Sequence, residues 1–146
     1  MPISLLWLID DDEQDRALSR QILAEHAPHI TLVTYSSATE AITALQHPDT
    51  TLPQLILLDL QMPLITGLEL LDLLKADPFC RQIPIVILSA SDDPQQIQQA
   101  YVKYASSYVN KAKTFEDFER QMVALLDFWR VASLPPVWYD ERKPLI

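Results

Sequence analysis

Short apolar runs of strand length alternate along the chain with longer segments in which apolar residues recur at helical spacing. Four apolar residues in a row form the run Leu55–Leu58, which prolines bound on both sides. A run of this kind is typical of a strand buried on both faces of a parallel sheet. The same reasoning predicts strands at Leu5–Ile9 and Ile83–Leu88. β-Branched and aromatic residues predict a strand at Thr31–Tyr35, and a weaker pattern predicts one at Ser107–Asn110.

The segments between these runs predict helices. Their expected positions are Gln14–Ala27, a segment that opens with the capping-box pattern Ser37–Glu40, about Leu68–Lys75, a segment that starts near Pro94, and Thr114–Trp129. The residues expected to face inward on the fourth helix are Ile97, Ala100, Tyr101 and Tyr104. On the last helix they are Phe115, Phe118, Met122, Leu125, Leu126 and Trp129.

Alternation of strands and helices predicts right-handed crossovers between parallel strands. The natural arrangement is a flavodoxin-like, doubly wound α/β fold, (βα)5, with a five-stranded parallel sheet in the order 2-1-3-4-5. In that order the switch point lies between the first strand, which runs into Asp10 and Asp11, and the third, which ends at Asp59. We therefore expect three carboxylates to meet at the carboxyl edge of the sheet. Taken alone, Asp59 could also be a turn residue or a helix cap.

Length, composition and charge narrow the class of protein. At 146 residues with 49% hydrophobic content, the chain is long enough for one domain with a full core. The net charge of -9 argues against binding to nucleic acid or to an anionic membrane, because phosphate binding depends on Lys and Arg. The only cysteine, Cys80, excludes an internal disulfide, and the apolar run near the N-terminus has no basic residue before it, unlike a signal peptide. We expect a cytoplasmic protein.

Three carboxylates at one sheet edge repel each other unless a cation compensates their charge. Magnesium suits such a site, because one or two carboxylates, waters and a phosphate oxygen commonly surround it, whereas the loop pattern of a calcium-binding EF-hand is absent. Neighbouring strand ends add the hydroxyl of Ser89 and the ammonium of Lys111, which could together bind a phosphoryl group on Asp59. We interpret three further acids as solvated first-turn residues of the first helix: Asp12, Glu13 and Asp15.

With these side chains at these strand ends, residues 4 to about 130 resemble the receiver domain of two-component response regulators. The resemblance implies that Asp59 is the phosphoacceptor, that Lys111 is the invariant lysine of the family and that Ser89 is its switch hydroxyl. It also implies that Asp10 and Asp11 are the acidic pair that binds Mg²⁺ together with Asp59.

The resemblance extends to the residues after the phosphoacceptor and to the fifth strand. Residues 59–67 match the family pattern Asp-x-x-Met-Pro-x-x-x-Gly. By this resemblance the backbone carbonyl of Gln61 would complete the magnesium shell. Tyr108 stands at the aromatic switch position of the family, where it would turn inward once Ser89 hydrogen-bonds the phosphoryl group.

The implied function is transfer of a phosphoryl group from the phosphohistidine of a sensor histidine kinase onto Asp59. The aspartate would attack as nucleophile while magnesium and Lys111 stabilise the phosphoryl oxygens. The family implies a phosphoacceptor with at most slow self-dephosphorylation and not an enzyme. The signal would pass by protein contact through the face made by the fourth helix, the fifth strand and the fifth helix.

Two alternative functions stay open at this level. Aspartyl-phosphate phosphatases also use an aspartate at a strand end with magnesium, but they need a second acid two residues later, where this chain has Gln61. A pseudo-receiver would bind a partner without accepting phosphate, and the intact set of site residues argues against it.

One position departs from the family pattern. The family normally follows its lysine with a proline in a cis peptide, whereas Ala112 follows Lys111 here. A cis bond before a non-proline residue costs about 2.5–4 kcal/mol. We therefore predict a trans Lys111–Ala112 bond and a shifted loop before the last helix.

The chain beyond the last predicted helix is too short for a second domain. We expect a receiver domain at residues 1–130, an arm at residues 131–146 and no output domain. The segment Phe128–Pro135 resembles the end of single-domain response regulators paired with bacterial and cyanobacterial phytochrome kinases. That resemblance makes a phytochrome the expected kinase, and a downstream relay protein would be a second partner.

The arm is apolar and aromatic, and exposed aromatic side chains favour docking to a partner. Because twofold symmetry is the usual arrangement of small oligomers, we predict a homodimer in which each arm reaches the other subunit's fourth or fifth helix. The expected interface residues are Trp129, Leu134, Pro135, Trp138 and Tyr139. Folding back onto its own domain and fraying are the alternatives for the arm.

Overall fold

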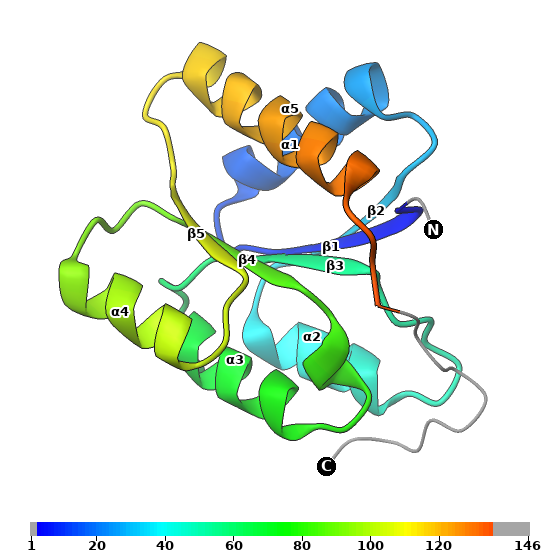
Figure 1. Ribbon diagram of the computed structural model, residues 1–146, viewed down its shortest axis with the longest axis vertical. Helices are drawn as coiled ribbons and strands as arrows, with labels where there is room; N and C mark the ends of the chain where they lie inside the picture. Colours follow the sequence, from blue (N-terminus) through cyan, green and yellow to red (C-terminus); the bar gives the residue numbers. More distant parts are fainter. Residues whose placement is uncertain (1–2, 136–146) are drawn as a thin grey trace.

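A five-stranded parallel sheet forms the centre of the molecule (Figure 1). The computed structural model describes residues 3–135, so the predicted interface residues Trp138 and Tyr139 lie outside the described part of the chain. The strands follow the order β2-β1-β3-β4-β5, which confirms the predicted doubly wound topology. Their bounds are β1 Leu5–Ile9, β2 Thr31–Tyr35, β3 Leu55–Leu58, β4 Ile85–Ser89 and β5 Ser107–Asn110.

Helices cover both faces of this sheet. Figure 1 shows α1 and α5 on one face and α2, α3 and α4 on the other. A short 3₁₀ turn, η1, precedes β4, which therefore starts at Ile85 and not at Ile83. The helix bounds are α1 Glu13–His26, α2 Ala38–Gln46, α3 Gly67–Ala76, η1 Cys80–Gln82, α4 Pro94–Val102 and α5 Phe115–Val131.

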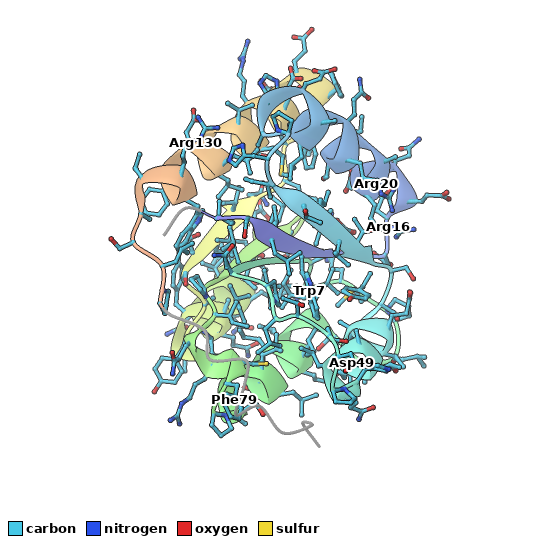
Figure 2. All side chains as sticks on the ribbon, turned by 90° about the vertical axis from the view of Figure 1, so that its right-hand side faces the viewer. Trp7, Arg16, Arg20, Asp49, Phe79 and Arg130 are labelled. Carbon is cyan, nitrogen blue, oxygen red and sulfur yellow. The ribbon has the colours of Figure 1, made fainter. Side chains whose placement is uncertain are left out.

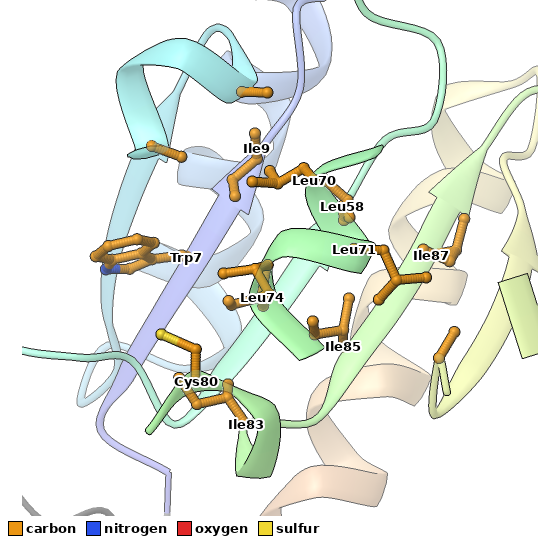
Figure 3. Packing of buried hydrophobic residues seen from close by; sticks show 14 of the residues in the cluster. Trp7, Ile9, Leu58, Leu70, Leu71, Leu74, Cys80, Ile83, Ile85 and Ile87 are labelled. Carbon is orange, nitrogen blue, oxygen red and sulfur yellow. The ribbon is translucent and has the colours of Figure 1, made fainter. Parts of the chain in front are cut away.

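The strands send alternate side chains into two apolar clusters, one on each face of the sheet. Figure 3 shows the cluster under α3, where Leu70, Leu71 and Leu74 lie over the strands. The strand residues in this cluster include Trp7, Ile9, Ile56, Leu58, Ile85 and Ile87. Those in the cluster under α1 and α5 include Leu6, Leu8, Leu55, Leu57, Val86 and Leu88. Because both faces are covered, these strands have continuous apolar sequences.

Two arginines fix α1 beside the sheet (Figure 2). Arg16 Nη1 donates to the backbone oxygen of Asp10 at 2.7 Å, and Arg20 Nη2 donates to Thr34 Oγ1 at 2.6 Å. The first turn of α1 is thereby held next to the end of β1.

Side-chain caps set the starts of α2 and α3. The predicted capping box at Ser37 is only half formed: Ser37 Oγ accepts from the Glu40 N–H at 3.1 Å, but the Glu40 carboxylate accepts from Ser36. A complete box occurs at α3, where Thr66 accepts from the Glu69 N–H at 3.2 Å and Glu69 accepts from the Thr66 N–H at 3.1 Å. This box fixes the start of the helix that follows the loop after Asp59.

The prediction that Tyr101 and Tyr104 face inward is wrong. α4 ends before Tyr104, which has a φ of 70° and is 76% exposed. The N–H of Ala105 donates to the oxygen of Ala100 at 2.9 Å and closes the helix end around this left-handed residue. Tyr101 is 48% exposed, because α4 packs on the sheet mainly through the small Ala100.

On α5 the predicted inward face is mostly correct. Phe115 is the exception: it is 44% exposed, because it is the first residue of the helix and lies ahead of the turns that pack on the sheet. The remaining side chains are buried or half-buried: Phe118, Met122, Leu125, Leu126 and Trp129.

The loop between β5 and α5 has trans peptide bonds, as do all the residues that the structure describes, so the predicted trans Lys111–Ala112 bond is confirmed. Gln121 of α5 holds this loop in place. Its Oε1 accepts from the Ala112 N–H at 2.9 Å, and its Nε2 donates to the Asn110 oxygen at 2.6 Å.

Candidate functional site

The polar residues predicted from the sequence lie at one edge of the sheet because the strand pairing continues past the strand ends. The Asp10 N–H donates to Tyr35 at 3.0 Å, the Asp59 N–H donates to Ile9 at 2.9 Å, and the Lys111 N–H donates to Ser89 at 2.7 Å, each to a backbone oxygen. Backbone hydrogen bonds thus align the first, third and fifth strand ends.

Three acids meet at this edge, as the strand order predicted. Carboxylate oxygens of Asp10, Asp11 and Asp59 lie within 4.8 Å of one another, a spacing at which they could hold one metal ion. Asp10 is completely buried and Asp59 is 5% exposed, whereas Asp11 is exposed. Buried carboxylates at this spacing need positive charge nearby.

Two donors occupy the carboxylate of Asp10. Its Oδ1 accepts from the Asp12 N–H at 2.9 Å, and its Oδ2 accepts from Lys111 Nζ at 2.6 Å. Asp12 is in turn the cap of α1, because its side chain accepts from the N–H groups of Gln14 and Asp15. The turn that starts α1 therefore wraps around the buried acid.

Lys111 makes a second ion pair that the sequence analysis missed. Its Nζ lies 2.8 Å from Asp15 Oδ2, so the interpretation of Asp15 as a solvated residue is wrong. α1 starts at Glu13, which turns the side chain of Asp15 toward the sheet edge instead of toward solvent. The described residues include no hydrogen bond between Lys111 and Asp59.

Burial dominates the electrostatics of the site. Burial raises the pKa of Asp59 to about 7; the charge of Lys111 opposes this shift, and the charges of Asp10 and Asp11 add to it. Burial likewise raises the pKa of Asp10 against the opposing hydrogen bond from Lys111. Burial alone would lower the pKa of Lys111, but its hydrogen bonds to Asp10 and Asp15 outweigh this effect and raise the pKa. Near neutral pH the carboxyl group of Asp59 is therefore only partly ionised.

Gly67 allows the chain after Asp59 to turn tightly into α3. A Cβ on Gly67 would lie 2.2 Å from the backbone oxygen of Asp59 and 2.6 Å from Leu60 Cα. The Gly67 N–H donates to the oxygen of Leu60 at 3.0 Å across this contact. In the same loop the Gln61 N–H donates to Asp59 Oδ1 at 3.3 Å, which fixes one oxygen of the carboxylate. The glycine of the motif is thus required by close approach of backbone to backbone.

Ser89 and Tyr108 meet at the loop that follows β4. Ser89 is completely buried, and its hydroxyl accepts from the Ser91 N–H at 3.2 Å. Tyr108 is half-buried, and its hydroxyl donates to the Ser91 oxygen at 2.6 Å. Its backbone N–H donates to the Tyr101 hydroxyl at 3.1 Å, so Ser91 and Tyr101 join these two residues in one network that the sequence did not reveal.

Residues 6–122 match the response regulator receiver domain, and the chain belongs to this family. The family match favours a receiver over the phosphatase alternative. Within residues 3–135, none of the helices has the length and apolar character needed to cross a membrane.

Several relatives match this chain over nearly their whole length. The structure of RcpA, described as a phosphorylated cyanobacterial phytochrome response regulator, is 29% identical, has a TM-score of 0.87 and covers 92% of this chain and 99% of its own. Rcp1 of Synechocystis sp. (strain ATCC 27184 / PCC 6803 / Kazusa) is 26% identical over 139 residues, which are 92% of this chain and 95% of Rcp1. The Mn²⁺-bound form of Rcp1 has a TM-score of 0.86 at 25% identity, over 91% of this chain and 99% of its own.

A further relative matches this chain over only part of its length. The probable methanogenesis regulatory protein FilR2 of Methanothrix harundinacea (strain 6Ac) is 35% identical over 78 residues, which are 53% of this chain and 50% of FilR2. The likeness to FilR2 therefore concerns only half of that protein.

Proposed function

We propose that this receiver accepts a phosphoryl group from the phosphohistidine of a sensor histidine kinase onto the carboxylate of Asp59. The placement of Asp59 carries the proposal. Its side chain is 5% exposed at the carboxyl end of the central strand, beside the buried acid Asp10 and the ammonium of Lys111. The carboxyl ends of parallel strands are the usual place for ligands in open α/β sheets.

Asp10, Asp11 and Asp59 are proposed to hold Mg²⁺, with the backbone carbonyl of Gln61 as a further ligand. Oxygen donors that converge within 4.8 Å fit a hard divalent cation, and a single lysine cannot compensate three carboxylates. When bound, the cation supplies positive charge that favours the ionised form of Asp59 and neutralises phosphoryl oxygens. The Mn²⁺-bound form of Rcp1 supports a divalent cation in proteins of this kind.

Asp59 acts as the nucleophile of the proposed transfer. One of its oxygens forms a bond to phosphorus in line with the bond from phosphorus to the donor histidine nitrogen, which breaks and leaves its electron pair on that nitrogen. The carboxylate must be ionised to attack, and a pKa of about 7 leaves it only partly ionised at neutral pH, so compensation of its charge favours the reaction. Lys111 supplies positive charge to the phosphoryl oxygens.

The network around Ser91 supplies the proposed switch. If the Ser89 hydroxyl turns to the phosphoryl group, it leaves the Ser91 N–H, and the loop that also accepts from Tyr108 must rearrange. Because Tyr101 of α4 accepts from Tyr108 of β5, this rearrangement reaches the face made by α4, β5 and α5. We place the output surface on that face.

Incubation of the full chain with Mg²⁺ and acetyl phosphate, followed by intact mass spectrometry, tests phosphate acceptance. We expect one added phosphate in the natural protein and none in Asp59→Asn or after removal of Mg²⁺ with a chelator. Asp49→Asn, which changes an exposed acid in the loop before β3, should behave like the natural protein. A natural protein that gains no phosphate would support the pseudo-receiver alternative instead.

A phytochrome kinase is the proposed donor, and a downstream relay protein is the proposed recipient of the signal. The likeness to RcpA over nearly its whole length supports this choice. Phosphotransfer from an autophosphorylated cyanobacterial phytochrome kinase should be at least about tenfold faster than from an unrelated histidine kinase at equal concentration, a specificity of about 1.4 kcal/mol. Equal rates from both kinases would contradict the pairing.

The arm after α5 is proposed to support a homodimer, with residues 1–130 as the receiver unit and 131–146 as the arm. Trp129 lines a groove of about 470 Å³ together with Val109, Leu125 and Phe128. Leu134 packs against the cluster under α1 and α5, and Pro135 is half-buried. The start of the arm thus lies against its own domain and leaves the groove as the apolar surface for a second copy.

Sedimentation of the full chain against a chain that ends at Ser133 tests the dimer. The full chain should sediment as a dimer at micromolar concentration, and the shortened chain as a monomer. If both chains sediment as monomers, the arm has no role in assembly. If both sediment as dimers, the interface lies outside the arm.

A further inference from the structure

Lys111 is bound by two carboxylates, and neither of them is the proposed phosphoacceptor. Its Nζ lies 2.6 Å from Asp10 and 2.8 Å from Asp15, and its side chain is only 10% exposed. Asp10 belongs to the group of acids that could hold a cation, whereas Asp15 is outside that group. The two acids that hold the lysine therefore respond differently when the site is loaded.

Asp15 is fixed on α1. Its N–H donates to the cap residue Asp12 at 3.3 Å, and its backbone oxygen accepts from Ser19 Oγ at 2.7 Å. Its side chain is 22% exposed, so water screens its attraction for Lys111 only in part. Asp15 thus presents a carboxylate at a fixed place beside the sheet edge.

The charges of the loaded site set up a competition for Lys111. A cation bound to Asp10 would compensate the charge of that acid and weaken its attraction for the lysine. Asp15 lies outside the group of acids that could bind the cation, so its attraction for the lysine would stay the same. The oxygens of a phosphoryl group on Asp59 need the same ammonium. Resting on the phosphoacceptor function proposed above, we propose that Asp15 is a positioning residue that retains Lys111 on the α1 side of the site and competes with the phosphoryl group for it.

Binding of beryllofluoride, a phosphoryl mimic, in saturating Mg²⁺ measures this competition directly. Asp15→Asn removes the charge but keeps a side chain of the same size, so we expect about threefold to tenfold tighter beryllofluoride binding in ¹⁹F NMR titration. The acetyl phosphate concentration at half-maximal phosphorylation rate should fall by a similar factor, while the maximal rate changes less. Asp15→Glu restores the negative charge and should return the affinity toward that of the natural protein.

Glu13→Gln is the matched control, because Glu13 is an exposed acid in the same first turn of α1. It removes the same charge from the same helix end without touching Lys111, so its beryllofluoride affinity should stay within about twofold. Equal tightening in Glu13→Gln would show a general charge effect and overturn the role of Asp15.

A merely structural role for Asp15 predicts the opposite sign. Loss of a supporting contact would weaken beryllofluoride binding and lower the melting temperature, and unchanged or weaker binding in Asp15→Asn would overturn the proposal. If Asp15→Asn fails to fold, Asp15→Ser provides a second uncharged variant for the same titration. Failure of the natural protein to gain phosphate would refute the proposed function itself, which the intact-mass experiment reads separately.

Discussion

Helices α3 and α4 lie next to each other on one face of the sheet, but they are packed very differently (Figure 1). α3 buries Gly67, Leu70, Leu71 and Leu74, whereas Ala100 is the one fully buried residue of α4. Large apolar side chains of the α4 segment are at the surface, including Val102 at 68% exposure. α3 starts directly after the loop that follows Asp59, and α4 carries the face on which we place the output.

The difference in packing indicates which part of the molecule opens most easily. Local opening is easiest where few apolar side chains are buried, so α4 and β5 should open before α3. The carboxylate of Asp59 is followed by a loop that leads into the tightly packed α3, whereas polar hydrogen bonds such as that from Tyr108 to Ser91 connect the α4 side to the site. Four substitutions test whether α3 and α4 differ in this way.

Gly67→Ala should have the largest effect, because it disrupts the close packing at the start of α3. The added Cβ meets the backbone of Asp59 and Leu60, which no side-chain movement can relieve. We expect a loss of about 3 kcal/mol in the free energy of unfolding by urea and a strong reduction in the rate of phosphorylation. Asp72→Ala removes only an exposed ion pair from the same helix and should cost less than about 1 kcal/mol. A Gly67→Ala protein as stable as this control would show that the loop adapts.

Asp59→Asn should show how much the buried negative charge of Asp59 destabilises the folded protein. The pKa of Asp59 is raised in the folded protein, so its contribution to stability is present at low pH and is lost as pH rises from about 4 through about 7. Without metal, Asp59→Asn should therefore be more stable than the natural protein at pH 8, by on the order of 2 kcal/mol, and this difference should vanish near pH 4. Urea unfolding in the presence of a chelator at both pH values measures this difference in stability. A difference that does not depend on pH would contradict the raised pKa of Asp59.

Tyr108→Phe should loosen the α4 side alone. It removes the hydrogen bond to the Ser91 oxygen, worth about 1 kcal/mol, and leaves the ring in place. Hydrogen exchange should accelerate in α4 and β5 and stay unchanged in α3. Uniform acceleration in all three elements would mean that the two helices open together.

Tyr104→Gly should have the smallest effect and should stabilise the protein slightly. Tyr104 adopts a φ of 70°, which glycine adopts without strain, so the end of α4 should gain about 0.5 kcal/mol. Leu64, with a φ of 68° and 93% exposure in the loop after Asp59, is the matched site on the packed side. Thermal melting of both glycine variants should show small and similar gains, and a loss in either would indicate a contact of the replaced side chain.

The sequence predicted the five strands and their order because the central strands β1, β3 and β4 have continuous apolar runs, although β4 begins two residues later than expected, after η1. The sequence also predicted which acids meet, because the strand order makes β1 and β3 neighbours and Asp10 and Asp59 directly follow these two strands. It failed where side-chain direction depends on where a helix begins or ends. A start of α1 at Glu13 turns Asp15 toward Lys111, and an end of α4 before Tyr104 turns that residue outward.

The proposed function requires that Asp59 itself carries the phosphoryl group. Reduction of the phosphorylated protein with borohydride converts an aspartyl phosphate to homoserine, which peptide mass mapping assigns to one position. We predict homoserine at position 59 after treatment with Mg²⁺ and acetyl phosphate, and none when Mg²⁺ is omitted. A protein that gains phosphate but yields homoserine at position 10 or 11, or at no position, would contradict the account.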